Sequence, residues 1–283
     1  MIKIKIYGSL MVLLLMFVSA GPVSAAPRVV VSIPPLYSLV SALMQGAEEP
    51  ALILEQDTAY SGNMDAFQKS QMIAADMVIW VGPGLETPIA RTLEQLPILD
   101  SKLITLSNYV PLLTRDDHQG PPESRQLSRD LRFWTDPRLA IMAVRMITPR
   151  LVRLDPEHQE LYLDNEIALI KKLKILEQDI AAMFVPFNSK PHDMVAGLDR
   201  YFAHRFMAST ELASNVDGAL YKVSTGRPTS CINIKSVKQN MTPAASYYFE
   251  TMRQTAQAVY SCIKGSQAQT TVAKQEQAEK HNI

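Results

Sequence analysis

Short apolar runs alternate with segments of helical periodicity through the first half of the chain. Continuous rather than alternating apolar residues are typical of parallel strands that are buried on both faces. Runs of this kind lie at residues 29–31, 52–54, 77–81 and 103–106. Between them, apolar residues recur at helical spacing in Leu36–Met44 and Met72–Ala75. The alternation predicts a parallel α/β sheet with right-handed crossovers, over about residues 26–155.

The longest helical pattern follows, over residues 156–186. Asp155 can cap such a helix, and Pro156 suits its first turn. Apolar residues at spacings of three, four and six form one face, made of Leu161, Ile167, Ile170, Leu173, Leu176, Ile180 and Met183. Pro186 and Pro191 end the pattern.

Signals for structure are weaker in the rest of the chain. Apolar runs of strand length occur only at residues 194–196, 220–223 and 231–234, so any second lobe over about residues 187–264 is small. The last segment, residues 265–283, is rich in Gln, Ala, Thr and Lys and has almost no large apolar residues. Such a segment buries too little apolar surface to offset its ordering entropy, so we expect disorder there.

Residues 1–25 have the pattern of a secretory signal. Lys3 and Lys5 precede the apolar run Leu10–Ala20, and small residues offer a cleavage site before Ala26. The run is too short for a permanent membrane anchor, and no cysteine follows it for lipid attachment. We therefore expect a periplasmic protein. The whole chain balances 28 basic against 28 acidic residues, which argues against a nucleic-acid partner.

Three stretches resemble one known family. They are Val29–Val40, Ala75–Glu86 and Phe133–Pro137, and together they resemble the zinc-uptake solute-binding proteins of metal ABC transporters, the ZnuA-like family. Weaker matches continue to about Phe202 and resume from Pro243 to Lys264.

The resemblance implies a fold and a function. The fold is two lobes of parallel-sheet α/β type, at residues 26–155 and 187–264, joined by a rigid helix at 156–186 that limits hinging. The function is periplasmic binding of zinc and its delivery, as a monomer, to an ABC transporter permease in the inner membrane.

The metal ligands that the resemblance implies are replaced in this chain. Asn63, Arg132 and Ala196 stand where the family usually has histidines. Zinc takes nitrogen, sulfur or carboxylate ligands, so an alanine cannot serve and an asparagine is a weak substitute. Arg132 also brings a permanent positive charge to the place of a cation. Zinc binding is therefore expected to be weak or absent, or the ligand to be altered.

The second lobe is shortened as well. The family's fourth ligand is a carboxylate in a turn late in this lobe, and no matching motif is present. From Cys231 the sequence passes almost directly into Thr242–Phe249, which resembles the family's last helix. A helix and a strand are thus missing relative to the family pattern.

Other metal sites find little support. In the family, a histidine-rich loop often occupies the place of the polar segment that contains Asp116, Asp117 and His118, so these three are weak candidates. A single histidine in a polar loop is more often simply a surface residue. His192 and His204 lack the spacing of a helical zinc site. Most methionines follow apolar patterns and are better explained as core residues.

Enzymatic motifs are missing from the sequence. It contains no nucleophile elbow, no HExxH and no phosphate loop, and Gly82-Pro83-Gly84 lacks the third glycine of a dinucleotide fingerprint. Asp136, near Arg132, is better explained by an ion pair or a turn cap. Two hypotheses remain. The chain is either a solute-binding protein of a zinc-type importer with altered affinity or ligand, or a metal-free relative that acts as an interaction protein.

The two cysteines, Cys231 and Cys262, are expected to form a disulfide. Their even number in an oxidising compartment favours a bond, and the resemblance implies one such bridge in the second lobe. Two buried thiols are the alternative. In protein from the periplasm, we expect reduction to lower the melting temperature by several degrees, because closing this loop stabilises by roughly 3 to 4 kcal/mol. A count of two free thiols in the unfolded, unreduced chain would contradict the bond.

Overall fold

The protein is described here by a computed structural model, which covers residues 26–54, 62–114, 129–187, 199–207 and 244–280. A four-stranded sheet forms from β1 (Val29–Val31), β2 (Ala51–Leu52), β3 (Met77–Trp80) and β4 (Leu103–Thr105). Its order is β2-β1-β3-β4 and all three pairings are parallel, as the apolar runs predicted. Every residue of β1 and β3 is buried, which explains their continuous apolar sequence.

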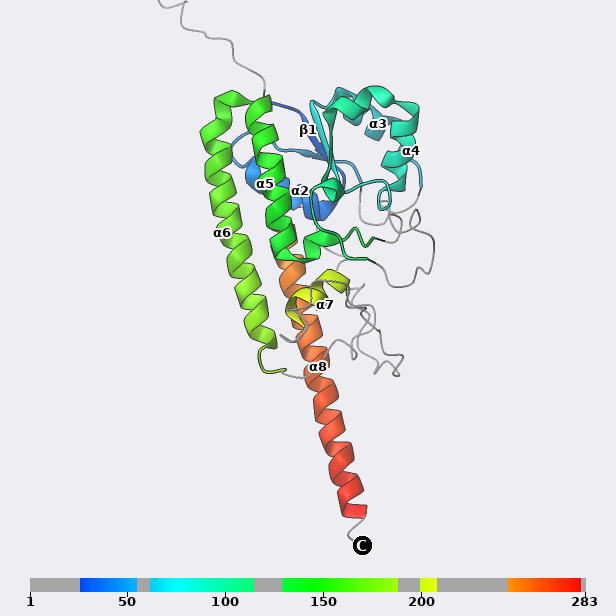
Figure 1. The fold of residues 1–283 in the computed structure, drawn as a ribbon, viewed down its shortest axis with the longest axis vertical. Helices are drawn as coiled ribbons and strands as arrows, with labels where there is room; N and C mark the ends of the chain where they lie inside the picture. The colour runs from blue at the N-terminus through cyan, green and yellow to red at the C-terminus, as the bar shows by residue number, and fades with distance from the viewer. Residues whose placement is uncertain (1–25, 55–61, 115–128, 188–198, 208–243, 281–283) are drawn as a thin grey trace, which may run out of the picture.

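Helices and short 3-10 turns connect the strands. The first crossover is α2 (Pro34–Leu43), the second contains α3 (Ala66–Ala74), and the third contains α4 (Thr87–Gln95) and η1 (Pro97–Lys102); η2 (Leu106–Asn108) follows β4. Two prolines begin α2, where their missing N–H groups cost no hydrogen bond. In α3, Asp65 and Gln68 form a capping box. Figure 1 shows α3 and α4 on one side of the sheet's edge, away from the long helices.

Two long helices follow η4 (Phe133–Thr135) and pack side by side (Figure 1). They are α5 (Pro137–Leu154) and α6 (Gln159–Phe184), joined by η5 (Pro156–His158). The predicted long helix is present, but Asp155 does not cap it. Its Oδ2 instead accepts hydrogen bonds from the Tyr162 hydroxyl at 2.7 Å and from His158 Nδ1 at 2.8 Å.

The predicted apolar face of α6 is partly buried. Leu173, Leu176 and Ile180 have at most 1% of their surface exposed, whereas Ile167 is 67% exposed. The helix thus uses only part of the periodic face for packing, and Tyr162 and Leu169 complete the buried stripe.

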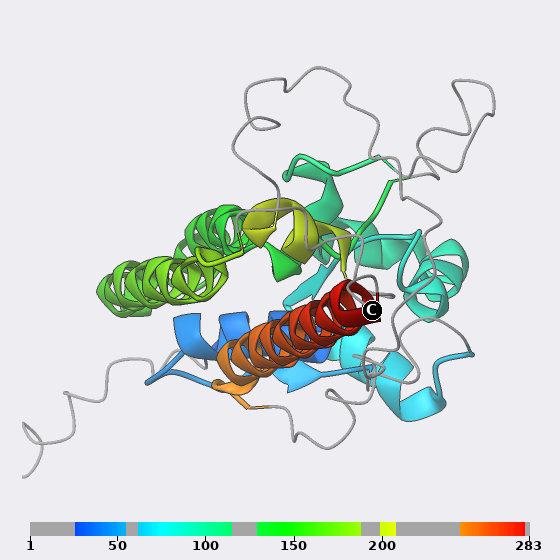
Figure 2. The same cartoon turned by 90° about the horizontal axis from the view of Figure 1, so that it is seen from below.

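The described part of the second half consists of α7 (Arg200–Phe206) and α8 (Tyr247–Lys280). The strands predicted at residues 194–196, 220–223 and 231–234 lie outside the described residues, as does Cys231, so those predictions and the disulfide stay predictions. Helix α8 packs against α2 and α6. Figure 2 shows it passing beneath α2.

Hydrogen bonds fix the start of α8 on the first lobe. The Ser38 hydroxyl of α2 donates to the Ala245 carbonyl at 2.7 Å and accepts from the Tyr248 N–H at 3.0 Å. The buried Tyr248 hydroxyl donates to the Trp134 carbonyl at 2.7 Å. The start of α8 therefore lies against α2, and the helix then runs away from the sheet (Figure 1).

The end of α8 differs from the sequence-based expectation. Disorder was expected over residues 265–283, but the helix continues to Lys280. Alanine, glutamine and lysine are good helix formers, and a helix already begun by the packed turns from Tyr247 to Ile263 adds residues without a new nucleation cost. Across the described ranges, none of the helices combines the length and the apolar character of a membrane span.

A buried carboxylate joins the ends of β1 and β3 to α4. The Glu86 side chain is fully buried and accepts hydrogen bonds from the Ser32 hydroxyl and from the N–H groups of Val81 and Gly82. Gly82 has a φ of +151°, a backbone conformation that residues with a side chain rarely adopt, so this turn favours glycine. Burial outweighs the hydrogen bonds and raises the pKa of Glu86 to about 7.

This raised pKa predicts a pH-dependent stability. The folded state holds the Glu86 proton more tightly than the unfolded state, so the stabilisation is complete below pH 4.5 and is lost as pH rises through about 7. Over that window the free energy of unfolding should fall by about 3 kcal/mol more in the native protein than in Glu86→Gln, at about 1.4 kcal/mol per pKa unit. Urea unfolding at several pH values between 5 and 8 measures both slopes.

Glu94→Gln is the matched control, because Glu94 lies on the same helix but is exposed. It should keep the native slope. Equal slopes for the native protein and Glu86→Gln would contradict the assignment.

Candidate functional site

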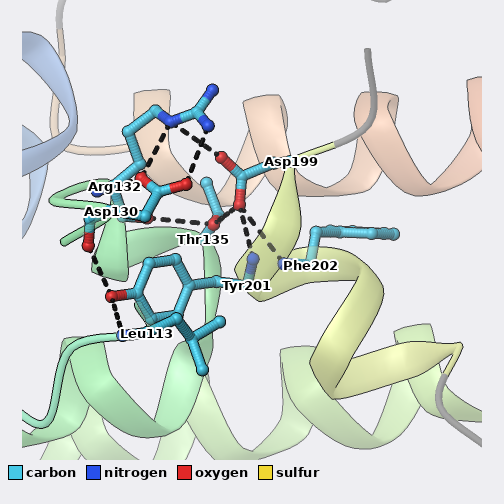
Figure 3. A network of polar contacts seen from close by, with 7 residues as sticks. All are labelled: Leu113, Asp130, Arg132, Thr135, Asp199, Tyr201 and Phe202. Carbon is cyan, nitrogen blue, oxygen red and sulfur yellow. Dashed lines mark hydrogen bonds and ion pairs between the residues drawn. The ribbon is translucent and has the colours of Figure 1, made fainter. Parts of the chain in front are cut away.

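The main polar network of the described residues lies where α7 meets the turn that precedes η4 (Figure 3). Arg132 ends this turn and Asp130 lies two residues before it. The Arg132 guanidinium donates to both oxygens of Asp130, from Nε to Oδ1 at 3.1 Å and from Nη2 to Oδ2 at 2.9 Å. The Arg132 backbone N–H donates to the same Oδ1 at 3.1 Å. This two-point contact fixes the plane of the guanidinium.

A second carboxylate approaches the same guanidinium from α7. Asp199 caps this helix, because its Oδ1 accepts from the N–H groups of Tyr201 at 3.0 Å and Phe202 at 3.3 Å. The Thr135 hydroxyl also donates to this oxygen. The other oxygen, Oδ2, lies 3.4 Å from Arg132 Nε. One cation is thus held between two carboxylates.

Tyr201 connects α7 to the loop that leads into the turn. Its hydroxyl donates to the Asp130 carbonyl at 2.6 Å and accepts from the Leu113 N–H at 2.9 Å. Burial raises the pKa of Tyr201, so the hydroxyl stays a donor at any physiological pH. Leu113 and Asp130 are also joined by a backbone hydrogen bond of 2.8 Å.

The three charged groups differ in exposure. The side chain of Asp130 is 4% exposed and that of Asp199 is 12% exposed, whereas that of Arg132 is 39% exposed. Buried carboxylates require an opposite charge or several hydrogen bonds, and here both have them. Arg132 therefore serves as a charge partner of Asp130 and Asp199, and its guanidinium cannot donate an electron pair to a metal.

Asn63, the first of the expected ligand positions, lies in the turn before α3 and is exposed. Its side-chain oxygen accepts from Arg91 Nη1 at 3.3 Å, and the same nitrogen lies 3.4 Å from the Gly62 carbonyl. Of the three expected ligand positions, one is therefore an arginine, Arg132, and another, Asn63, accepts a hydrogen bond from an arginine, Arg91.

Ala196 and the loop candidates Asp116, Asp117 and His118 lie outside the described residues, as does His192. Among the residues that are described, no group of three or more His, Cys, Asp or Glu side chains is placed to hold a metal ion. His158 is bonded to Asp155, and His204 is exposed on α7. No described residues fit the usual zinc ligand set.

Asp136 has the capping role that was considered for it. Its Oδ1 accepts from the Arg138 N–H at 2.8 Å at the start of α5, and the ion-pair partners of Arg132 are Asp130 and Asp199 instead. Sequence reasoning missed these two aspartates. One signal was available for Asp199. Aspartate is favoured at helix N-caps, and Asp199 lies three positions before Phe202.

Family comparison agrees with the fold and with the sequence motifs. The family described as "Zinc-uptake complex component A periplasmic" matches residues 29–219, and the chain belongs to this family. The family consists of transport components rather than enzymes, as the absence of catalytic motifs suggested.

Individual relatives are distant. The chain is 28% identical over 217 residues to the high-affinity zinc uptake system protein ZnuA of Brucella abortus, which covers 63% of this chain and 64% of that protein. It is 24% identical over 204 residues to ZnuA of Yersinia pestis, with 64% of each chain covered. The chain thus spans about 64% of the length of these relatives.

Solved structures support the same architecture. The periplasmic zinc-binding protein TroA of Treponema pallidum matches with a TM-score of 0.62 and 14% identity, over 84% of this chain and 99% of that one. FpvC of Pseudomonas aeruginosa, solved with Mn²⁺, matches with a TM-score of 0.62 and 18% identity, over 85% and 99%. The fold is therefore mixed α/β with a parallel sheet, of the type seen in two-lobe solute-binding proteins.

Proposed function

We propose that the chain is the periplasmic solute-binding component of a zinc-type metal ABC importer, with its usual metal ligands replaced so that affinity or cargo is altered. One observation carries this proposal. Within a family match over residues 29–219, Arg132 stands at an expected ligand position with its charge engaged by Asp130 and Asp199.

Electrostatics supports an altered cargo site. Two like unit charges 4 Å apart repel by about 4 kcal/mol at an effective dielectric constant of 20, and a divalent ion doubles that figure. Asp130 and Asp199 offset part of this repulsion, but both are already committed to Arg132. At the other described position, the Asn63 side-chain oxygen is a weak, neutral metal ligand. It already accepts a hydrogen bond from Arg91.

Location and partners follow from the same proposal. The signal pattern over residues 1–25 is expected to direct the chain to the periplasm and to be cleaved there. The mature monomer would deliver its cargo to a permease in the inner membrane. The relatives from Brucella abortus and Yersinia pestis are described as parts of zinc uptake systems, which supports this assignment.

A metal-free relative that acts as an interaction protein is the second candidate. The internal pairing of Arg132 favours it, because both carboxylates beside this position already have a cationic partner without a metal. In that case the fold and the docking surface would be retained while the cargo is lost.

Zinc titration of the purified, chelator-stripped protein tests the altered site. We expect binding far weaker than nanomolar and only a small rise in melting temperature with added zinc, because a ligand stabilises in proportion to its binding to the native state. Isothermal titration calorimetry measures the affinity. A single nanomolar site that persists in His118→Ala would contradict the proposal.

Restoring the ligands tests whether the family geometry survives. The triple variant Asn63→His, Arg132→His and Ala196→His should gain at least two orders of magnitude in zinc affinity, on the order of 3 kcal/mol. Three imidazoles and a water can complete a zinc centre, so the fourth carboxylate need not be restored. Calorimetry on the folded variant gives the comparison.

A control variant with Asn63→Ala and Arg132→Ala removes the charge without adding imidazoles. It should gain much less affinity than the triple variant. A folded triple variant with unchanged affinity would favour the interaction-protein candidate.

A further inference from the structure

The carboxylate of Asp130 fixes the position of the Arg132 side chain that pairs with Asp199. Three contacts join it to Asp130, two from the guanidinium and one from the backbone N–H. Asp130 belongs to the same short loop, so this part of the arrangement is local. The Arg132 side chain consequently loses little further freedom when it pairs with Asp199 from α7.

Asp199 couples that charge to the start of α7. One carboxylate oxygen accepts from the N–H groups of Tyr201 and Phe202 and from the Thr135 hydroxyl, while the other oxygen faces Arg132. Because the Asp199 side chain is only 12% exposed, solvent and salt screen the pair less than an ordinary surface pair. Loss of Arg132 would remove an opposite charge from a carboxylate that is largely shielded from water.

Further contacts join α7 to the first lobe and to α6, including the buried Phe206 and an ion pair between Arg205 and Glu177. The Tyr201 hydroxyl bridges the Asp130 carbonyl and the Leu113 N–H, and Phe202 packs edge-on against Phe184 of α6 at a centroid distance of 6.0 Å. Hydrogen bonds in such a partly buried network strengthen one another. Removal of one charged member should therefore loosen α7 as a unit.

We propose that Arg132 is a built-in latch, whose guanidinium supplies the positive charge that holds α7 against the η4 turn in the absence of any metal. The position of α7 is then set by the chain itself and not by bound cargo. This inference goes beyond the proposed function, since it holds whether or not the protein delivers a metal to a permease.

Hydrogen exchange of the full-length protein, followed by mass spectrometry of peptides covering α7, tests the latch. In native protein kept in chelator, α7 should exchange slowly, and excess zinc should leave the rate unchanged. Arg132→Ala should raise the α7 exchange rate at least tenfold while β3 peptides keep their protection.

Asp199→Asn separates the charge from the cap, because asparagine caps helices as well as aspartate does. It should raise the α7 rate as Arg132→Ala does. The double variant Arg132→Ala, Asp199→Asn should exchange little faster than either single variant, because both remove the same interaction.

Arg138→Ala is the matched control. Arg138 pairs at 2.6 Å with Glu177, whose side chain is 12% exposed like that of Asp199, and in this variant the pair between Glu177 and Arg205 of α7 remains. The α7 rate should stay within twofold of the native rate in this variant.

Three results would overturn the latch: an unchanged α7 rate in Asp199→Asn, fully additive effects in the double variant, or slower α7 exchange when zinc is added to native protein. If Arg132→Ala also loses β3 protection, Asp199→Asn alone decides. The proposed function is tested separately by the zinc titration, whose outcome does not alter these rates in chelator.

Discussion

Burial of α2 on all sides is the constraint on which the rest of the structure depends. Nine of its ten residues are buried, between the sheet on one side and α5, α6 and α8 on the other. A helix surrounded in this way must present apolar surface in every direction, and the few polar groups that remain need partners inside the molecule. Ser38 has such partners in Ala245 and Tyr248 of the last helical segment. The need to cover α2 thus explains why the start of α8 packs on the first lobe.

The polar network at α7 follows a different physical principle. The sheet and helices are held mainly by buried apolar area, whereas α7 adds charge pairs and hydrogen bonds to the burial of Tyr201, Phe202 and Phe206. Asp130, Arg132 and Asp199 lie where the core gives way to the surface, and Arg132 is the most exposed of the three. At that depth an ion pair is neither fully screened by water nor burdened with the full desolvation cost of the interior.

Fold and cargo chemistry are separable in this protein. The family match and the TroA-like architecture depend on apolar packing and on turns such as the Gly82–Glu86 segment. Metal binding in a fold of this type depends on a few side chains, and the same fold can carry different sites.

Sequence reasoning predicted the parallel strands and the long α6 region, because apolar periodicity is a local property. It was less accurate where a choice depended on neighbours. Asp155 binds Tyr162 and His158 rather than capping a helix, and α8 continues to Lys280 beyond the expected ordered region. The charge partners of Arg132 were decided only by tertiary structure. Asp199 is distant in sequence, and only the packing of α7 on the η4 turn brings its carboxylate to the guanidinium.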